Sequence, residues 1–204
     1  MILPRFEDTS QAIVLQKPHQ LALSQVALTA PVEGDVVVDI LYSGISTGTE
    51  KLLWSGRMPD FPGMGYPLIP GYESVGVVVH KERGAAHELG DFVFVPGAKC
   101  FGDLRGLFGG AASRVVVPAD RALPIAESLG ERGVLLALAA TAHHAYHADS
   151  AAQPDLIIGH GVLGRLIARL AVIAGHSPVV WETNPMRREG ALGYRVIDPA
   201  DDTC

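Results

Sequence analysis

Hydrophobic residues in the first part of the chain, residues 1–125, come in short runs rich in valine, isoleucine and leucine, separated by glycine and proline. Such runs predict β-strands, because β-branched side chains pack well on a pleated surface. Strands are predicted at residues 12–15, 21–23, 35–42, 74–79, 91–95 and 112–117. Many short strands with turn residues between them indicate a small barrel or sandwich.

The pattern changes beyond residue 125, where longer apolar segments alternate with short ones. A helix, a strand, a second helix and a second strand are predicted, in that order, at residues 131–146, 155–158, 165–174 and 179–181. A glycine-rich turn separates the first strand from the second helix. Strand, glycine turn, helix and strand make half of a mononucleotide-binding unit. The chain is therefore predicted to be an α/β protein.

Composition excludes several classes of protein. The 204 residues are 48% hydrophobic and 19% charged, which is typical of a folded globular protein. The net charge is −6 and no basic cluster stands out, so a nucleic-acid-binding role is not expected. Apolar runs fall short of the about 20 residues of a membrane span. Two isolated cysteines, Cys100 and Cys204, make neither a disulfide framework nor a structural zinc site, and a cytoplasmic location is expected.

The glycine-rich turn has the spacing G-x-G-x-x-G at Gly159, Gly161 and Gly164. Alone this motif is weak, but a strand before it and a helix after it make it specific. Gly159 permits a tight turn, Gly161 lets the backbone approach a pyrophosphate, and Gly164 lets the helix pack closely. The start of the helix, at Val162 and Leu163, offers free N–H groups to phosphates. The alternative is that the glycines only turn the chain.

Glu182 ends the second strand, 18 residues after Gly164. A carboxylate at this place accepts hydrogen bonds from the ribose hydroxyls of NAD and repels the 2′-phosphate of NADP. NAD is therefore the predicted cofactor. Arg187 and Arg188 follow closely and complicate the choice, since either side chain can meet a phosphate. In the alternative interpretation, Glu182 is only a solvated strand end.

Several motifs resemble the medium-chain dehydrogenases. They are the segment P-L-I-P-G-Y-E-S-V-G-V-V at 67–78, G-D-F-V-F-V-P at 90–96, G-G-A-A-S-R-V-V-V-P at 109–118, and Thr141-Ala142. The resemblance spans nearly the whole chain. It implies a GroES-like β-barrel catalytic domain at 1–125, a helical hinge at 126–150 and a partial Rossmann domain at 151–204.

Three further stretches, at 43–50, 94–101 and 105–113, resemble the branch of this family that acts on a bacteriochlorophyllide. This resemblance implies a tetrapyrrole substrate whose 3-hydroxyethyl side chain is oxidised to acetyl. Two alternatives stay open: a zinc-free reductase for a quinone or an enone, and an inactive truncated remnant. Aromatic and methionine side chains can line a pocket for a flat tetrapyrrole or close the barrel core: Trp54, Met58, Phe61, Met64, Tyr66, Phe101 and Phe108.

The chain departs from the family pattern in two ways. Zinc-dependent members place a cysteine where Ser46 stands, a histidine where Tyr72 stands, and usually a cysteine near Ala137. Hydroxyl and methyl groups do not replace such ligands, so no metal is predicted. A Rossmann sheet has about six strands, whereas the pattern here reaches two, with residues 196–199 as the start of a further element. We therefore expect a truncated chain, and the resemblance leaves room for a homodimer of the full-length form.

The resemblance also implies a set of site residues. Without zinc, a side chain must take the hydroxyl proton. The predicted catalytic residues are Ser46, Thr49, Lys51, Tyr72 and Glu73, within a segment that also contains Thr47 and Glu50. The predicted cofactor-binding residues are Thr141, Gly159, Gly161, Val162, Leu163, Gly164, Glu182, Thr183, Asn184 and Arg187. Plain packing is the alternative for Tyr72, and a structural acid is the alternative for Glu73.

His143 and His147 are four residues apart and can share one helix face. A histidine pair at that spacing can bind a metal ion, but no third ligand is evident. An ordinary helix surface is the favoured interpretation.

Overall fold

The computed structural model describes residues 8–146 and 154–202. The chain divides into two compact units, Met1–Leu135 (unit 1) and Leu136–Cys204 (unit 2). The predicted hinge, residues 126–150, lies across this division. Among the described residues, no helix has the length and apolar character needed to cross a membrane.

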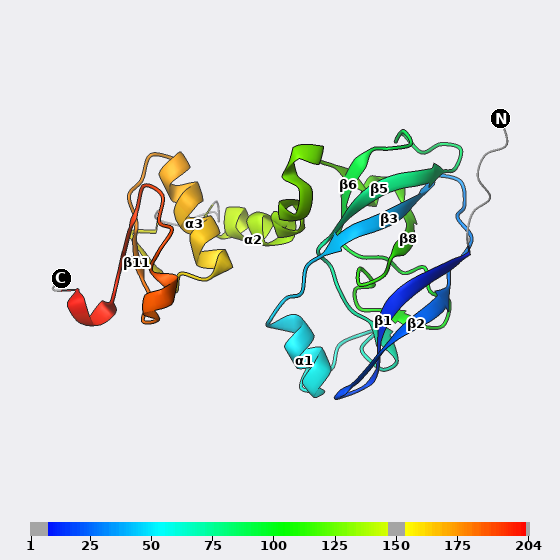
Figure 1. The fold of residues 1–204 in the computed structure, drawn as a ribbon, viewed down its shortest axis with the longest axis horizontal. Helices are drawn as coiled ribbons and strands as arrows, with labels where there is room; N and C mark the ends of the chain where they lie inside the picture. The colour runs from blue at the N-terminus through cyan, green and yellow to red at the C-terminus, as the bar shows by residue number, and fades with distance from the viewer. Residues whose placement is uncertain (1–7, 147–153, 203–204) are drawn as a thin grey trace. The chain divides into compact units, whose positions relative to one another are not determined.

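Unit 1 contains two β-sheets (Figure 1). The five-stranded sheet has, in spatial order, β8 (Arg114–Pro118), β3 (Asp35–Ser43), β5 (Ser74–Lys81), β6 (Phe92–Val95) and β9 (Leu123–Pro124). The four-stranded sheet has β2 (Gln20–Ala27), β1 (Thr9–Lys17), β4 (Leu68–Ile69) and β7 (Arg105–Gly106). All six strands predicted in this region are therefore confirmed. The β4 and β7 strands pair in parallel, and the other paired strands of unit 1 are antiparallel.

Burial explains why these segments become strands. The central strand β3 buries three successive valines, Val36, Val37 and Val38, as expected of a strand covered on both faces. The β1 strand alternates instead between buried and exposed positions, as expected of a strand with one wet face. Residues of both sheets contribute to one core, so the two sheets pack as a closed, barrel-like unit.

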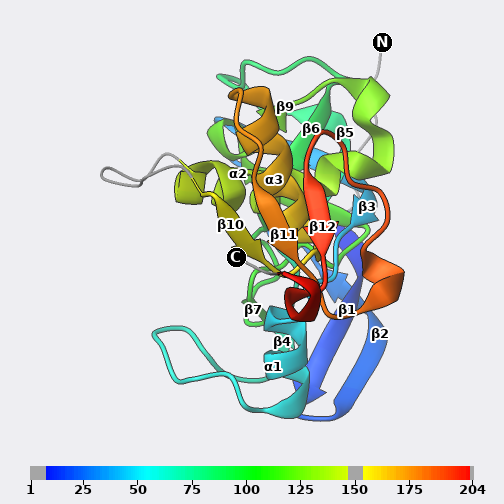
Figure 2. The same cartoon turned by 90° about the vertical axis from the view of Figure 1, so that its left-hand side faces the viewer.

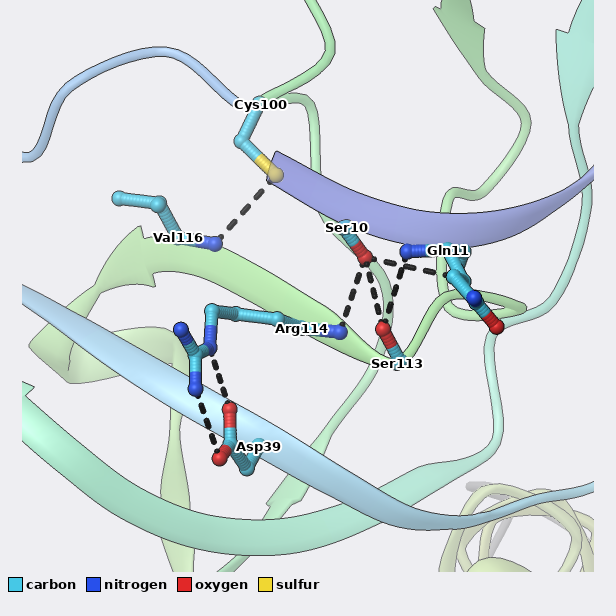
Figure 3. A network of polar contacts seen from close by, with 7 residues as sticks. All are labelled: Ser10, Gln11, Asp39, Cys100, Ser113, Arg114 and Val116. Carbon is cyan, nitrogen blue, oxygen red and sulfur yellow. Dashed lines mark hydrogen bonds and ion pairs between the residues drawn. The ribbon is translucent and has the colours of Figure 1, made fainter. Parts of the chain in front are cut away.

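A polar network ties the start of β1 to the other sheet (Figure 3). The Ser10 and Ser113 hydroxyls are 3.3 Å apart, Gln11 N–H donates to Ser113 Oγ at 3.0 Å, and Arg114 N–H donates to Ser10 Oγ at 3.0 Å. The Arg114 guanidinium forms a two-point ion pair with Asp39 on the neighbouring strand, at 2.5 and 2.9 Å. Paired geometry of this kind is stronger than a single contact.

The stretch around Trp54, for which no helix was predicted, contains helix α1 (Thr49–Ser55). Gly56 ends the helix in a left-handed conformation, with φ of 68°. This is the usual way for a glycine to stop a helix. Leu53 is the buried anchor of the helix. The helix was missed because it is too short for a periodic pattern.

The helix predicted at 131–146 is only half right. Glu127–Leu135 forms 3-10 helix (η2), and the α-helix α2 covers Leu136–Tyr146. The physical reason lies in two glycines. Gly130 has non-helical angles, with φ of 51° and ψ of −133°. A Cβ on Gly133 would lie 2.8 and 2.9 Å from side chains packed against it, so this segment follows the sheet surface instead of a regular helix.

Unit 2 holds a parallel sheet in the order β10 (Leu156–Ile158), β11 (Val179–Trp181) and β12 (Arg195–Ile197), with helix α3 (Val162–Ile173) (Figure 2). Ala168 of α3 packs with Ile157, Val180 and Tyr194 in one core. The two predicted strands are confirmed. The further element expected to start at residues 196–199 is β12, a third strand paired in parallel with β11.

Three single-turn 3-10 helices complete the described elements: η1 (Ala119–Arg121), η3 (Pro185–Arg187) and η4 (Pro199–Asp201). The last two start with proline after Asn184 and Asp198, whose side-chain oxygens each accept a backbone N–H. This is the usual chemistry of a capped turn.

Candidate functional site

The glycine turn of unit 2 follows strand β10 and leads into helix α3. Gly159 has φ of 98°, a conformation that residues with a Cβ rarely adopt. Its N–H donates to the Trp181 carbonyl at 2.7 Å, which ties the turn to the end of β11. A Cβ on Gly164 would lie 1.9 Å from the carbonyl oxygen of Gly159. Gly159 and Gly164 therefore have the turning and close-packing roles expected from the sequence.

Gly161 has a different environment. It caps the start of α3 with an ordinary φ of −74°, and no heavy atom lies within 4 Å of a Cβ built on it. The backbone N–H groups of the first helical turn, including Val162 and Leu163, have no partner within the helix. They also lie at the positive end of the helix dipole. The arrangement offers open space and hydrogen-bond donors, which is what a pyrophosphate needs.

Glu182 follows β11 and turns back towards the glycine turn. Its carboxylate accepts hydrogen bonds from the backbone N–H of His160 at 2.9 Å and of Asn184 at 2.8 Å. These two donors, with a smaller effect of the Arg187 charge, lower the pKa of Glu182. Its side chain is buried, and is not the freely solvated strand end of the alternative interpretation. A carboxylate has about four lone-pair sites, so this one retains acceptor capacity for ribose hydroxyls.

His160, between the first two glycines, was missed by sequence reasoning. It is 1% exposed. Its Nδ1 lies 2.6 Å from the Arg187 carbonyl, and its Nε2 lies 2.8 Å from the Tyr194 hydroxyl. A ring with its proton on Nδ1 satisfies both contacts, because the carbonyl then accepts and Tyr194 donates. The only sequence signal was a histidine at a variable position of the motif, and nothing there indicates its distant partners.

The residues after Glu182 differ in availability. Thr183 and Arg187 are exposed, and Asn184 Oδ1 accepts the Met186 N–H at 3.0 Å. Arg188 is engaged: its Nε donates to the Glu182 carbonyl at 2.8 Å and its guanidinium pairs with Asp198. Of the two arginines that complicated the choice of cofactor, Arg188 is therefore held within the protein.

Thr141 lies on α2, where its hydroxyl donates to the Ala137 carbonyl at 3.0 Å. It is exposed. Its predicted contact with a nicotinamide stays a prediction. His143 is exposed on the same helix, and His147 lies outside the described residues, as does Cys204.

Unit 1 contains an apolar cavity of about 520 Å³. Its apolar wall comes from the β1–β2 hairpin, the loop before α1 and α1 itself, with Ile13, Leu15, Leu23, Ile45 and Trp54 as the main contributors. Among the described residues that line it, Glu50 carries the only ionisable side chain. Its volume is within the range of small-molecule sites, about 300–1,000 Å³.

The predicted catalytic residues come from two parts of unit 1. Ser46, Thr49 and Lys51 lie just before or within α1, and Tyr72 and Glu73 lie between β4 and β5. Ser46 Oγ accepts the Thr49 N–H at 3.3 Å, and Lys51 is exposed on the helix. Tyr72 packs edge-on against Phe108, with ring centroids 5.7 Å apart, as its packing alternative expects. None of these side chains contributes to the cavity wall. Their catalytic roles stay predictions.

Glu73 is 4% exposed and its Oε1 has no hydrogen-bond partner. The alternative of a structural acid therefore has no hydrogen bond at Oε1 to support it, and the catalytic role of Glu73 stays a prediction. Burial raises the pKa of Glu73. Glu50 was not among the predicted catalytic residues, although it lies in the same segment. Both of its carboxyl oxygens are buried without a hydrogen-bond partner. Burial, and to a smaller degree the charge of Glu73, raises the pKa of Glu50.

The donor set does not fit the zinc of the related dehydrogenases. Ser46 and Tyr72 present a hydroxyl and a phenol, and Ala137 presents a methyl group, where zinc prefers cysteine sulfur and histidine nitrogen. In the described part of the chain, no three His, Cys, Asp or Glu side chains gather as a metal site requires.

The aromatic and methionine residues divide between the two roles weighed for them. Trp54 lines the cavity. Met58, Met64 and Tyr66 pack with Trp54 against a small core of Leu15, Leu53, Leu68 and Leu107, and Phe101 belongs to the main core. Phe61 and Phe108 are partly exposed. Core packing is thus the commoner role.

Comparison with known proteins gives the class. Residues 32–127 match the alcohol dehydrogenase GroES-like domain. The chain thus contains an alcohol dehydrogenase GroES-like domain, and its fold is α/β, with this domain followed along the chain by a parallel sheet. It is 56% identical, over 95% of its own length, to 2-desacetyl-2-hydroxyethyl bacteriochlorophyllide A dehydrogenase of Rhodobacter capsulatus. The chain spans 62% of the length of that relative.

Solved structures show the same fold at low sequence identity. The 2R,3R-butanediol dehydrogenase of Bacillus subtilis aligns with a TM-score of 0.78 and 22% identity over 96% of this chain and 65% of its own. An alcohol dehydrogenase of E. coli CFT073, complexed with NADH, aligns with a TM-score of 0.75 and 21% identity over 96% of this chain and 64% of its own.

Proposed function

We propose that the protein is an NAD-dependent alcohol dehydrogenase that oxidises the hydroxyethyl side chain of a bacteriochlorophyllide to an acetyl group. The observation that carries the redox part is Glu182, held by two backbone N–H groups beside an open glycine turn. The substrate is taken from the name of the Rhodobacter capsulatus relative. The apolar lining and the volume of about 520 Å³ of the cavity in unit 1 support an apolar ligand.

In this proposal the start of α3 binds the pyrophosphate through the N–H groups at Gly161, Val162, Leu163 and Gly164. Glu182 accepts hydrogen bonds from the ribose hydroxyls. When bound, the nicotinamide supplies an acceptor for the hydride that leaves the alcohol carbon. A 2′-phosphate would meet a carboxylate whose lowered pKa keeps it charged, which favours NAD over NADP. Arg187 remains exposed nearby, so a phosphate contact there would oppose this preference.

Calorimetric titration with NAD and NADP tests the cofactor. We expect NAD to bind at least about tenfold more tightly, because like-charge juxtaposition costs at least about 1.4 kcal/mol. The titration is made on these 204 residues and on a version extended to the length of the Rhodobacter capsulatus relative. Failure of both to bind NAD would contradict the proposal.

The substrate is tested by mixing the extended protein with NAD and the hydroxyethyl pigment, and following NADH absorbance together with the pigment spectrum. The proposal requires equal amounts of NADH and acetyl pigment. A matched assay with NADH and a quinone or an enone separates the reductase alternative, for which NADH consumption is expected. A cytoplasmic location and a homodimer of the full-length form stay predictions from the sequence.

A further inference from the structure

Glu50 is an unusual residue for an apolar cavity. It lies in the first turn of α1 and is the only ionisable side chain among the described residues that line the cavity. Both carboxyl oxygens are buried and neither has a hydrogen-bond partner. Backbone groups at Ser46, Glu50 and Gly71 favour its charged form, but none reaches either oxygen in hydrogen-bonding geometry.

Glu73 brings a second carboxyl group to the same loop. A Cβ on Gly44 would lie 2.5 Å from Glu73 Oε2, so only glycine at position 44 leaves room for this carboxyl group. Gly44 itself lines the cavity, and its N–H donates to the Glu73 carbonyl at 2.6 Å. Glu50 and Glu73 are also close enough for their charges to interact. Two carboxyl groups thus lie at one cavity wall, with both oxygens of Glu50 and Oε1 of Glu73 buried without a hydrogen-bond partner.

Such an arrangement is costly if both groups are ionised. A buried carboxylate without a partner loses its hydration, and two adjacent carboxylates repel each other. No ion pair involves either group in the described part of the chain. Burial, and to a smaller degree the charge of Glu73, therefore raises the pKa of Glu50. A carboxylate with a raised pKa binds a proton more strongly than a solvated one, which suits a general base.

We propose that Glu50 is the catalytic base that takes the hydroxyl proton of the substrate. Glu73 is the positioning residue, and its neighbouring carboxyl group strengthens the affinity of Glu50 for a proton. The inference rests on the proposed function. In the step, the O–H bond breaks and its proton goes to a carboxyl oxygen of Glu50. The C–H bond of the same carbon breaks and its hydrogen leaves with both electrons to the nicotinamide. The C–O single bond becomes the carbonyl of the acetyl product.

Other titratable groups near this wall are few. Lys51 follows Glu50 but is exposed, and Tyr72 precedes Glu73 and packs on Phe108. His19, on the hairpin, packs edge-on against Trp54, with ring centroids 5.5 Å apart. The β1–β2 hairpin contributes no ionisable side chain to the cavity wall among the described residues. Among the described residues, Glu50 is therefore the one ionisable residue that lines the cavity.

The test measures pigment binding, which needs neither cofactor nor turnover. Acetyl bacteriochlorophyllide and its hydroxyethyl counterpart are titrated, by absorbance, into this chain and into Glu50→Gln and Glu73→Gln variants. Glu127→Gln, an exposed glutamate of the same unit, is the matched control. Protonated Glu50 donates to the acetyl carbonyl, whereas ionised Glu50 does not. We expect acetyl-pigment affinity to fall about tenfold as the pH rises through the titration of Glu50, because a buried acceptor loses its donor.

The hydroxyethyl pigment should show a weaker dependence, because its hydroxyl can donate to the ionised group. In Glu50→Gln the amide donates at every pH, so acetyl-pigment binding becomes independent of pH. In Glu73→Gln the fall moves to lower pH, because the neighbouring charge is removed. Glu127→Gln should behave like the unaltered chain. Kinetics of the extended protein give the second measurement: Glu50→Gln lowers kcat at least about 100-fold with little change in KM.

The outcomes separate this inference from the proposed function. Binding with the same pH dependence in the unaltered chain and in Glu50→Gln overturns the role of Glu50 and leaves the pigment as substrate. Absence of pigment binding at every pH overturns both. A kcat unaffected by Glu50→Gln in an enzyme that oxidises the pigment overturns the inference alone.

Discussion

The backbone N–H of His160 donates a 2.9 Å hydrogen bond to Oε2 of Glu182. This contact joins the glycine turn after the first strand of unit 2 to the end of the second. The same histidine reaches the Arg187 carbonyl and the Tyr194 hydroxyl with its ring. The carboxylate proposed to bind the ribose is thus held in place by the same turn that is proposed to bind the phosphates.

Gly164→Ala and Gly161→Ala should separate folding from binding. The added methyl of Gly164→Ala would lie 1.9 Å from the Gly159 carbonyl oxygen, so the helix must move. We expect a loss of about 1–3 kcal/mol of stability, the usual cost of overpacking. At Gly161 the methyl meets no atom within 4 Å and the φ of −74° suits alanine. Stability should hold while NAD affinity falls, because the methyl fills the space proposed for pyrophosphate.

The measurements are urea unfolding and NAD calorimetry for both variants. Equal unfolding curves for Gly164→Ala and the unaltered chain would contradict the packing argument. Full NAD affinity in Gly161→Ala would contradict the proposed position of the pyrophosphate.

Glu182→Gln should weaken NAD binding. His160 and Asn184 donate to different oxygens of Glu182, so in the amide one of these N–H groups faces an NH₂ donor and loses its acceptor. It also lacks the charge that favours ribose hydroxyls as donors. We expect NAD affinity to fall about ten- to hundredfold and the preference over NADP to shrink. Calorimetry with both cofactors checks this, with the exposed Glu189→Gln as control. Unchanged discrimination in Glu182→Gln would sink the proposed role.

Tyr194→Phe should destabilise unit 2. It removes the hydroxyl 2.8 Å from His160 Nε2 and leaves a buried nitrogen without its partner. Such a loss costs about 1–3 kcal/mol. Urea unfolding measures it, and Tyr42→Phe, an exposed tyrosine, is the control. If both phenylalanine variants unfold alike, the hydroxyl contact contributes nothing.

Cys100 should make the stability fall in alkaline solution. Burial raises the pKa of its thiol from 9.0 to about 11, although the Val116 N–H donates to its sulfur at 3.3 Å. The unfolded chain releases this proton first, so stability is complete below pH 9.0 and declines between pH 9.0 and about 11. The slope is about 1.4 kcal/mol per pH unit.

Unfolding midpoints measured against pH check this expectation, on a background that carries Cys204→Ser. In Cys100→Ala on the same background, the part of the decline due to this thiol should vanish. The folded Cys100 should also resist thiol reagents at neutral pH, since the thiolate is the reactive form. Rapid labelling of the folded protein at neutral pH would contradict its burial.

Local patterns predicted much of the framework. Valine-rich runs such as 35–42 form strands, because the order of hydrophobic and polar residues indicates which positions of a strand are buried. The glycine turn at 159–164 was predictable, since the positive φ of Gly159 and the close approach of Gly164 to the Gly159 carbonyl both require glycine. The sequence pattern did not indicate the 3-10 conformation that extends to Leu135. It indicated a further element at 196–199 but not its pairing with β11, because strand pairing depends on another segment of the chain.

By itself the sequence determined the glycine turn, most of the strands and the residue types at the positions where zinc-dependent relatives have their ligands, Ser46, Tyr72 and Ala137. Tertiary structure decided which polar groups meet. His160 and Tyr194 are 34 residues apart in the sequence and form a hydrogen bond. The carboxyl group of Glu73 packs against Gly44, where a Cβ would lie 2.5 Å from its Oε2. Burial and hydrogen bonding depend on atoms brought together from distant segments. No local pattern indicates whether a glutamate ends in water, as Glu127 does, or unpartnered beside a cavity, as Glu50 does.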